Sequence, residues 1–270
     1  MKNQKQTYWS IGDYEECLNL TIDLSRLLLL KFTENSSSIK DQIIYHFIAK
    51  SAGLIESILI LWKNKHYSEC WILYRALIDR LIHLWYLNKN EEFELYHKWT
   101  FIQKVEANNR AKSDTLFNKK LDSEYFDLSE ADRKKYEKLK KEDISWKRPK
   151  AEDVSKKEGL SFIYKYGYDF ASTKVHPMAD EGMQDLSRLI ELNLDNMKFA
   201  DNKIILNNTL AIYAVILEDS LNISDLKWVK IIYDYIKEIM NFLKSNSKRY
   251  KETHSKLYFY LERNEITFCK

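Results

Sequence analysis

The sequence predicts an all-α protein, a helical bundle of long antiparallel helices with a charged, partly irregular insertion. Only five glycines and two prolines occur among the 270 residues, which are too few turn-forming residues for many short strands and hairpins. Apolar residues also recur at helical spacing through most of the chain. Since 45% of the residues are hydrophobic and 14% are aromatic, the chain has ample material for a packed core.

The N-terminal part of the chain predicts four helices. Their apolar patterns cover Tyr14–Phe32, Ile39–Trp62, Tyr67–Leu87 and Glu91–Lys112. A serine-rich break precedes the second helix, and Ser37 or Ser38 can cap its start. Lys63–Lys65 and Asn88–Asn90 separate the remaining helices. We expect the second and third helices, which are both strongly apolar, to form an antiparallel hairpin.

Residues 113–159 differ in character, because the apolar period fades and charged residues of both signs increase. Ser129, with Asp132 three residues later, can cap a short charged helix there. We interpret the chain as a single helical domain over residues 1–270, with 113–159 as a peripheral insertion. This insertion could be a lid or a partner surface, or only a solvated helix of mixed charge.

Helical periodicity returns at Leu160 and ends at His176–Pro177, where proline prevents simple continuation of a helix. Ser224 is expected to cap one of the later helices, with Asp225 favouring its dipole. Three further helices are predicted at Phe199–Leu221, Ser224–Lys244 and Thr253–Asn264.

Composition and charge bear on several functional classes. The net charge is +3, far from the concentrated positive charge that a dedicated duplex-DNA binder usually carries, so nucleic acid is neither implied nor excluded. The three cysteines, Cys17, Cys70 and Cys269, lack metal-binding spacing and suggest free thiols in a reducing compartment. Met1–Ser10 has no apolar stretch behind it, and Ile204–Leu217 is too short to span a membrane. We therefore expect a cytoplasmic protein with no membrane partner.

The third predicted helix is apolar on nearly every side and carries Arg75 and Asp79 at a spacing of four. If the hairpin turns near Lys65, Glu56 lies level with Arg75 and is a second carboxylate partner, with His83 one turn further along. A guanidinium fixed in this way could present its remaining donors to a phosphate or another anion. Alternatively, the cluster only fixes the register of the helices.

Ser172 and His176 fall one helical turn apart at the end of a predicted helix. A histidine there suits a general acid or base, although it could equally interact with the carboxyl end of the helix. Asp169 would complete a hydrolase triad, but the sequence around it has neither a nucleophile elbow nor a glycine-rich oxyanion loop.

The six histidines include no HExxH motif, and Glu94-x-x-His97 is the one Glu-x-x-His sequence where a di-iron bundle needs two. We therefore expect no metal and no cofactor. Arg249 and His254, with four residues between them, form an alternative catalytic pair that could act on an RNA phosphodiester. The same segment is also typical of a solvated basic surface, and such a pair arises easily by chance.

The pattern Arg75-x-x-x-Asp79, followed by Ser172-x-x-x-His176-Pro177, resembles an uncharacterised bacterial family of helical proteins, known only as a domain of unknown function. The resemblance covers roughly Ile43–Ser187. In that family the arginine is typically followed by glutamate, so Asp79 is a shortened version of the carboxylate.

The arrangement also distantly resembles the HEPN superfamily, whose members are often metal-independent ribonucleases in toxin and phage-defence systems. The HEPN signature is an arginine, four to six residues and a histidine. Arg75 and His83 are too far apart for it and Arg80 and His83 are too close, so Arg249 and His254 alone fit. This resemblance implies an endoribonuclease with RNA as partner. The alternative is a non-enzymatic helical binding or regulatory module, with a second copy or another protein as partner.

Overall fold

The fold is described from a computed structural model, which defines residues 10–114, 127–142, 144–176, 182, 186, 189–190, 203–262 and 267–269. Helices dominate this part of the chain, and they confirm the predicted all-α helical bundle. The chain divides into two compact units, one formed by Met1–Tyr86 with Ala151–Lys270 and the other by Leu87–Lys150. We describe each unit by itself.

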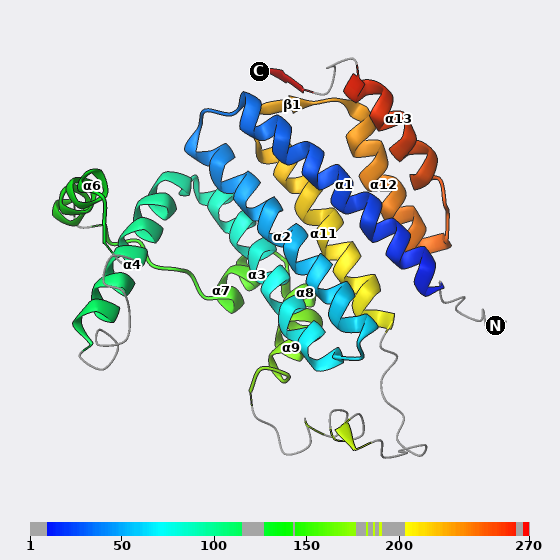
Figure 1. Cartoon of the computed structure of the whole chain (residues 1–270), viewed down its shortest axis with the longest axis horizontal. Helices are drawn as coiled ribbons and strands as arrows, with labels where there is room; N and C mark the ends of the chain where they lie inside the picture. Colours follow the sequence, from blue (N-terminus) through cyan, green and yellow to red (C-terminus); the bar gives the residue numbers. More distant parts are fainter. Residues whose placement is uncertain are drawn as a thin grey trace. The chain divides into compact units, whose positions relative to one another are not determined.

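The first unit begins with three long helices, whose positions confirm the predicted ones. They are α1 (Ile11–Asn35), α2 (Ile39–Lys63) and α3 (Tyr67–Asn90). The hydroxyl oxygen of Ser38 accepts a hydrogen bond from the backbone N–H of Asp41, so Ser38 is the N-cap of α2. Ser10 caps α1 in the same way through Asp13. Figure 1 shows α1, α2 and α3 running alongside one another.

The α2–α3 hairpin turns through three residues, among which Lys65 has a φ of 63°. The thiol of Cys70 lies 3.5 Å from the carbonyl oxygen of Ile58, which sets the register of the two helices. Arg75 lies five residues after Cys70 on α3, and Gly53 lies five residues before Ile58 on α2. In this register, Arg75 is therefore level with Gly53. The hairpin is confirmed, but its register is shifted from the predicted one.

The C-terminal part contributes α11 (Lys203–Ile223), α12 (Lys230–Ser245) and α13 (Tyr250–Glu262). Two short strands, β1 (Leu226–Trp228) and β2 (Thr267–Cys269), pair antiparallel and were not predicted. In Figure 1, α11 lies beside α1 and α2, while α12 and α13 form a second pair next to α1. These helices complete the bundle of the first unit.

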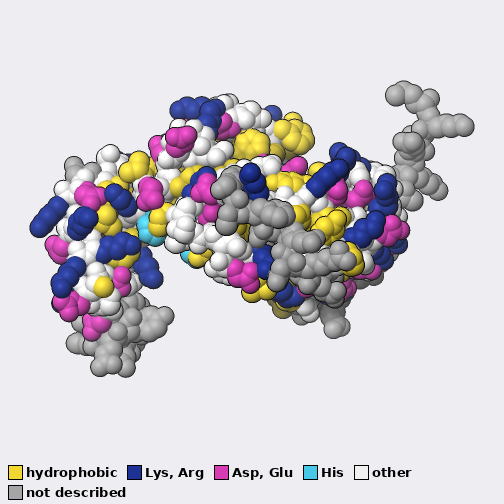
Figure 2. Space-filling view, turned by 90° about the horizontal axis from the view of Figure 1, so that it is seen from above, with side chains coloured by type: hydrophobic (Ala, Val, Ile, Leu, Met, Phe, Trp, Pro, Cys, Tyr) yellow, Lys and Arg dark blue, Asp and Glu magenta, His cyan; other side chains and the backbone are white. Residues whose placement is uncertain are grey.

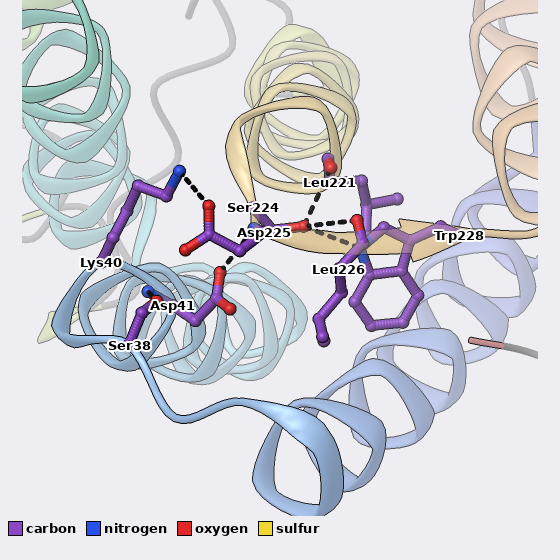
Figure 3. A network of polar contacts seen from close by, with 8 residues as sticks. All are labelled: Ser38, Lys40, Asp41, Leu221, Ser224, Asp225, Leu226 and Trp228. Carbon is purple, nitrogen blue, oxygen red and sulfur yellow. Dashed lines mark hydrogen bonds and ion pairs between the residues drawn. The ribbon is translucent and has the colours of Figure 1, made fainter. Parts of the chain in front are cut away.

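Ser224 does not cap the helix that follows it, contrary to our prediction, because β1 intervenes and α12 begins only after Val229. Its hydroxyl instead donates toward the carbonyl oxygens of Leu221 and Leu226, and accepts a hydrogen bond from Trp228 Nε1 at 2.9 Å. Figure 3 shows these contacts of Ser224 at the turn between α11 and β1.

The same turn is joined to the start of α2. The carboxylate of Asp41, which is 1% exposed, accepts a hydrogen bond from the backbone N–H of Asp225 at 2.9 Å. Lys40 forms an ion pair with the Asp225 side chain (Figure 3). One buried carboxylate therefore connects two segments that are far apart in the sequence.

The centre of the first unit is apolar, with tyrosine hydroxyls paired inside it. Tyr213 is fully buried and its hydroxyl lies 2.6 Å from that of Ser25. Tyr235 makes a longer contact of 3.4 Å with Thr21. Two helices, Ile39–Lys63 and Ile204–Ile223, are long and apolar enough to cross a membrane. Within the most apolar stretch of each, 50% and 61% of the residues are buried in the bundle, as expected for core helices.

Between the two halves of the first unit, the chain forms short helical pieces that follow one another and lie beside α3 in Figure 1. They are α7 (Ala151–Lys157), α8 (Ser161–Ile163), η2 (Tyr164–Asp169) and α9 (Phe170–Ser172). The piece η2 is a π-helix, a wider turn that is rare and found frequently at functional sites.

The second unit contains α4 (Phe93–Ser113) and α6 (Glu130–Lys141), and Ser129 caps α6 through Asp132 as predicted. Trp146 packs against Trp99 at a centroid distance of 4.9 Å and donates from Nε1 to Glu92 at 2.6 Å. The predicted insertion began only at residue 113, whereas this unit begins at Leu87. The difference arises because α4 packs with α6.

Candidate functional site

Arg75 lies on α3 and contacts a tyrosine from the π-helical segment. Its Nη2 donates a hydrogen bond of 2.8 Å to the hydroxyl of Tyr168, and its guanidinium carbon lies 4.6 Å from the centre of the same ring. Among the residues that the structure describes, Arg75 Nε is buried without a hydrogen-bond partner. The structure thus gives the guanidinium a tyrosine partner where the sequence predicted a carboxylate.

Gly167 explains how η2 approaches α3 so closely. A Cβ atom at this position would lie 2.7 Å from Ile78 Cδ1 and 3.4 Å from the Tyr74 hydroxyl. A side chain here would displace the end of Ile78, so glycine favours the close approach of the two segments. Burial raises the pKa of Tyr74 above its ordinary value, since the phenolate would lose its hydration. Tyr168, which directly follows Gly167, reaches Arg75 from this closely packed segment.

Two other polar residues of α3, His83 and Arg80, form hydrogen bonds within their own helix. His83 is buried, and its Nδ1 donates to the backbone carbonyl oxygen of Asp79 at 2.6 Å. Arg80 donates from Nη1 to the backbone carbonyl oxygen of Ala76, also at 2.6 Å. Asp79 is partly buried and lies one turn beyond Arg75.

Glu56 is exposed on α2, so the prediction that it enters the buried cluster is wrong. The register defined by Cys70 and Ile58 brings Gly53, rather than Glu56, level with Arg75. The turn lies near Lys65 as predicted, but counting equal numbers of residues away from it misplaces the register by a few residues, and each residue rotates the side chain by about 100° around the helix.

Ser172 belongs to the same segment as Tyr168, and its hydroxyl donates to the Tyr168 carbonyl oxygen at 2.8 Å. His176 lies one turn later, where its backbone N–H donates to the Ser172 carbonyl oxygen at 3.3 Å and its side chain is exposed. Asp169 is also exposed. Hydrogen bonds therefore link three predicted residues in sequence. Arg75 contacts Tyr168, Ser172 contacts Tyr168, and His176 contacts Ser172 through its backbone.

The alternative pair lies on and just before α13. Arg249 is exposed, whereas His254 is only 7% exposed and packs against Tyr235 at a centroid distance of 5.5 Å. Burial lowers the pKa of His254, because the charged imidazolium would lose its hydration. The two side chains of this pair therefore differ in exposure, since Arg249 is exposed and His254 is buried.

Sequence reasoning missed Tyr168 and Gly167, which complete the Arg75 contact. A signal was present, since Tyr164 and Tyr168 are four residues apart and the only glycine of this helical stretch directly precedes Tyr168. The two tyrosine rings stack at 5.3 Å with an interplanar angle of 17°. The spacing of apolar residues in this stretch predicts an ordinary helix and does not reveal the wider turn of η2.

No group of three or more His, Cys, Asp or Glu side chains that could hold a metal occurs within the described part of the chain. Cys17 and Cys70 are free thiols and are buried. Burial raises the pKa of Cys70 to about 12, so this thiol stays protonated near neutral pH and is a poor nucleophile.

The charge distribution gives no strong electrostatic field of one sign. Figure 2 shows a face of the molecule on which Lys and Arg side chains are interspersed with Asp and Glu. On α6, Lys134 pairs with Glu130 at 2.7 Å. On the face shown, the described residues therefore form no large patch of one charge sign.

The chain matches a family of unknown function, DUF5677, over residues 41–197. This span is more than half of the 270 residues, and the chain belongs to this family. The match confirms the resemblance to an uncharacterised helical family. It covers Arg75, Tyr168 and His176, whereas Arg249 and His254 lie outside it. No curated protein and no solved structure gives a significant match.

Proposed function

We propose that this chain is a cytoplasmic helical binding protein that holds a phosphate-bearing ligand at Arg75. The observation that carries the proposal is the Arg75–Tyr168 contact. A tyrosine hydroxyl and ring orient the guanidinium without neutralising its charge, whereas a carboxylate would do both. The donors left for a ligand are those of Nη1 and the second hydrogen of Nη2, which can hold two phosphate oxygens at once.

Calorimetric titration with inorganic pyrophosphate tests this proposal. Arg75→Gln removes the charge and should abolish the binding heat. Arg75→Lys keeps the charge but loses the planar fork, so affinity should fall about tenfold. Arg26→Gln is the matched control, because Arg26 is 65% exposed and pairs with Asp23 on α1. Equal binding by the wild type and Arg75→Gln, or no binding by the wild type, would refute the proposal.

A metal-independent ribonuclease of the HEPN type is a second candidate, supported by the position of His176. Its exposed imidazole follows Ser172 on the segment that holds Arg75 through Tyr168. In this proposal the arginine stabilises the phosphate charge and the histidine transfers a proton. Such an activity would fit a role in defence or growth arrest.

RNA cleavage in the presence of a chelator tests this second candidate. His176→Ala should abolish cleavage, while His254→Ala should reduce stability and leave the cleavage rate per folded molecule unchanged. Loss of cleavage in His254→Ala at full folding would instead favour the Arg249–His254 pair. If RNA remains intact, or is cleaved only with a divalent metal, the ribonuclease proposal fails and the binding proposal stands.

A further inference from the structure

Three large aromatic side chains protrude from the segment that carries Tyr168. Phe162, Tyr166 and Phe170 are 73%, 60% and 46% exposed. They are spaced four residues apart, so they lie close to one face of the helical segment. The rings of Phe162 and Tyr166 are in contact, with centroids 4.8 Å apart. We call these three side chains the aromatic shelf.

The aromatic shelf is connected to the surroundings of Arg75 through ring contacts. Phe170 packs edge-on against Trp71 at 5.0 Å, and Trp71 packs against Tyr74 at 5.5 Å. Tyr74 directly precedes Arg75 on α3. The aromatic shelf is therefore connected through Trp71 to α3, the helix that carries Arg75.

Two lysines lie on the segment of the aromatic shelf. Lys165 extends its ammonium group to 5.5 Å from the Tyr166 ring centre. Lys174 follows on the same stretch, which also carries Asp169, and the adjoining α7 adds charges of both signs. Exposed aromatic rings beside cations are the combination with which proteins hold single-stranded nucleic acids, because bases stack on the rings and phosphates approach the cations.

We propose that the aromatic shelf stacks the bases of a single-stranded nucleic acid, one phosphate of which is bound by Arg75. This inference rests on the proposed binding function and names its ligand class. Sequence preference should be weak, since every base has a flat face that can stack. Affinity should fall as salt rises, because the phosphate contacts release counterions.

Fluorescence anisotropy with two labelled strands of equal length provides the test. One strand is oligodeoxythymidylate, which lacks the 2′-hydroxyl and is therefore bound without cleavage through that group. The other is an abasic deoxyribose-phosphate strand, which keeps the phosphates and lacks the bases. We expect the wild type to bind the first strand at least about tenfold more tightly, since stacking contributes about 1–3 kcal/mol per base.

Two variants separate the contribution of base stacking on the aromatic shelf from that of phosphate binding at Arg75. Phe162→Ala with Tyr166→Ala should remove this preference and leave binding of the abasic strand unchanged, whereas Arg75→Gln should weaken binding of both strands. Phe259→Ala is the matched control, because Phe259 is a 53% exposed aromatic residue on α13. Phe162 and Tyr166 are both exposed, so their replacement should leave the melting temperature unchanged.

Each outcome decides between the two proposals. If both strands bind equally to the wild type and the double variant, the aromatic shelf proposal fails and phosphate binding at Arg75 stands. If neither strand binds, the aromatic shelf proposal fails, and the pyrophosphate titration alone decides phosphate binding at Arg75. If the double variant converts a wild-type dimer into a monomer in sedimentation and leaves strand binding unchanged, the aromatic shelf is a protein interface and the nucleic-acid proposal is overturned.

Discussion

At the scale of single residues, two glycines have opposite roles. A Cβ atom at Gly167 would lie 2.7 Å from Ile78 Cδ1, whereas at Gly53 nothing lies within 4 Å. Gly167→Ala should therefore lower the free energy of unfolding by about 1–3 kcal/mol through overpacking. Gly53→Ala, within the exposed surface of α2, should raise it by about 0.5–1 kcal/mol. Urea unfolding of both variants checks this, and destabilisation by Gly53→Ala would contradict it.

The polar residues of the site were predictable only in part. Arg75 and Asp79 were found because charges on an otherwise apolar helix are conspicuous. The prediction for Glu56 is wrong because it depends on the register of α2 and α3, where a shift of a few residues moves a side chain to another face even though the turn lies near Lys65 as predicted. Tyr168 was missed because aromatic residues at helical spacing usually indicate packing, and nothing in the sequence showed that its hydroxyl would reach an arginine.

At the scale of elements, the start of α2 depends on one hydroxyl. Ser38 accepts a hydrogen bond from the Asp41 N–H at 3.1 Å. Ser38→Ala should lower the free energy of unfolding by about 1 kcal/mol, because an N–H of the first turn loses its acceptor. Ser57→Ala is the matched control, since Ser57 only donates to a carbonyl oxygen within α2. Thermal unfolding should show a larger change for Ser38→Ala than for Ser57→Ala.

The buried carboxyl of Asp41 should make stability depend on pH. Burial raises its pKa, and the nearby negative charge of Asp225 acts in the same direction. A carboxyl whose pKa is raised on folding favours the folded state most at pH values below its unfolded pKa, and this contribution is lost as pH rises through the folded pKa. Asp41→Asn keeps an oxygen for the Asp225 N–H but cannot ionise. Its stability relative to the wild type should therefore increase between about pH 3 and about pH 7.

Chemical denaturation of both proteins across this range measures that difference. Parallel pH profiles for the wild type and Asp41→Asn would show that the carboxyl does not contribute to the pH dependence of stability.

The local sequence pattern at Ser224 and Asp225 predicts the start of a helix. Strand pairing between β1 and β2, over a long sequence separation, determines instead where α12 begins.

At the scale of the whole molecule, stability should come from the apolar centre of the bundle. Ile58 is fully buried on α2, while Ile60, two residues later, is 57% exposed. Ile58→Ala should lower the free energy of unfolding by about 2–5 kcal/mol, because it removes buried methyl groups and leaves a cavity. Ile60→Ala should change it by less than about 0.5 kcal/mol. Similar losses in the two variants, measured by urea unfolding, would contradict the bundle arrangement.

The overall fold was the most predictable feature, since long apolar periods and scarce glycine and proline leave few alternatives to a helical bundle. The starts of α2 and α6 were predictable from Ser38 and Ser129, because these caps are local, whereas the start of α1 at Ser10 lies before the predicted Tyr14. The division into two units was less accessible. It depends on α4 packing with α6, a contact between segments whose sequences are charged and show little periodicity.

The π-helical turn of η2 has a consequence for variation in chain length. A π-helical turn accommodates one residue more than an α-helical turn of the same rise. Deleting a single residue within it, such as Lys165, should let the segment close into an ordinary α-helix and leave the residues beyond it in place, because the wider turn is what takes up the extra residue. A natural relative that lacks one residue here should therefore have an uninterrupted α-helix in this segment and keep the same partner for its arginine.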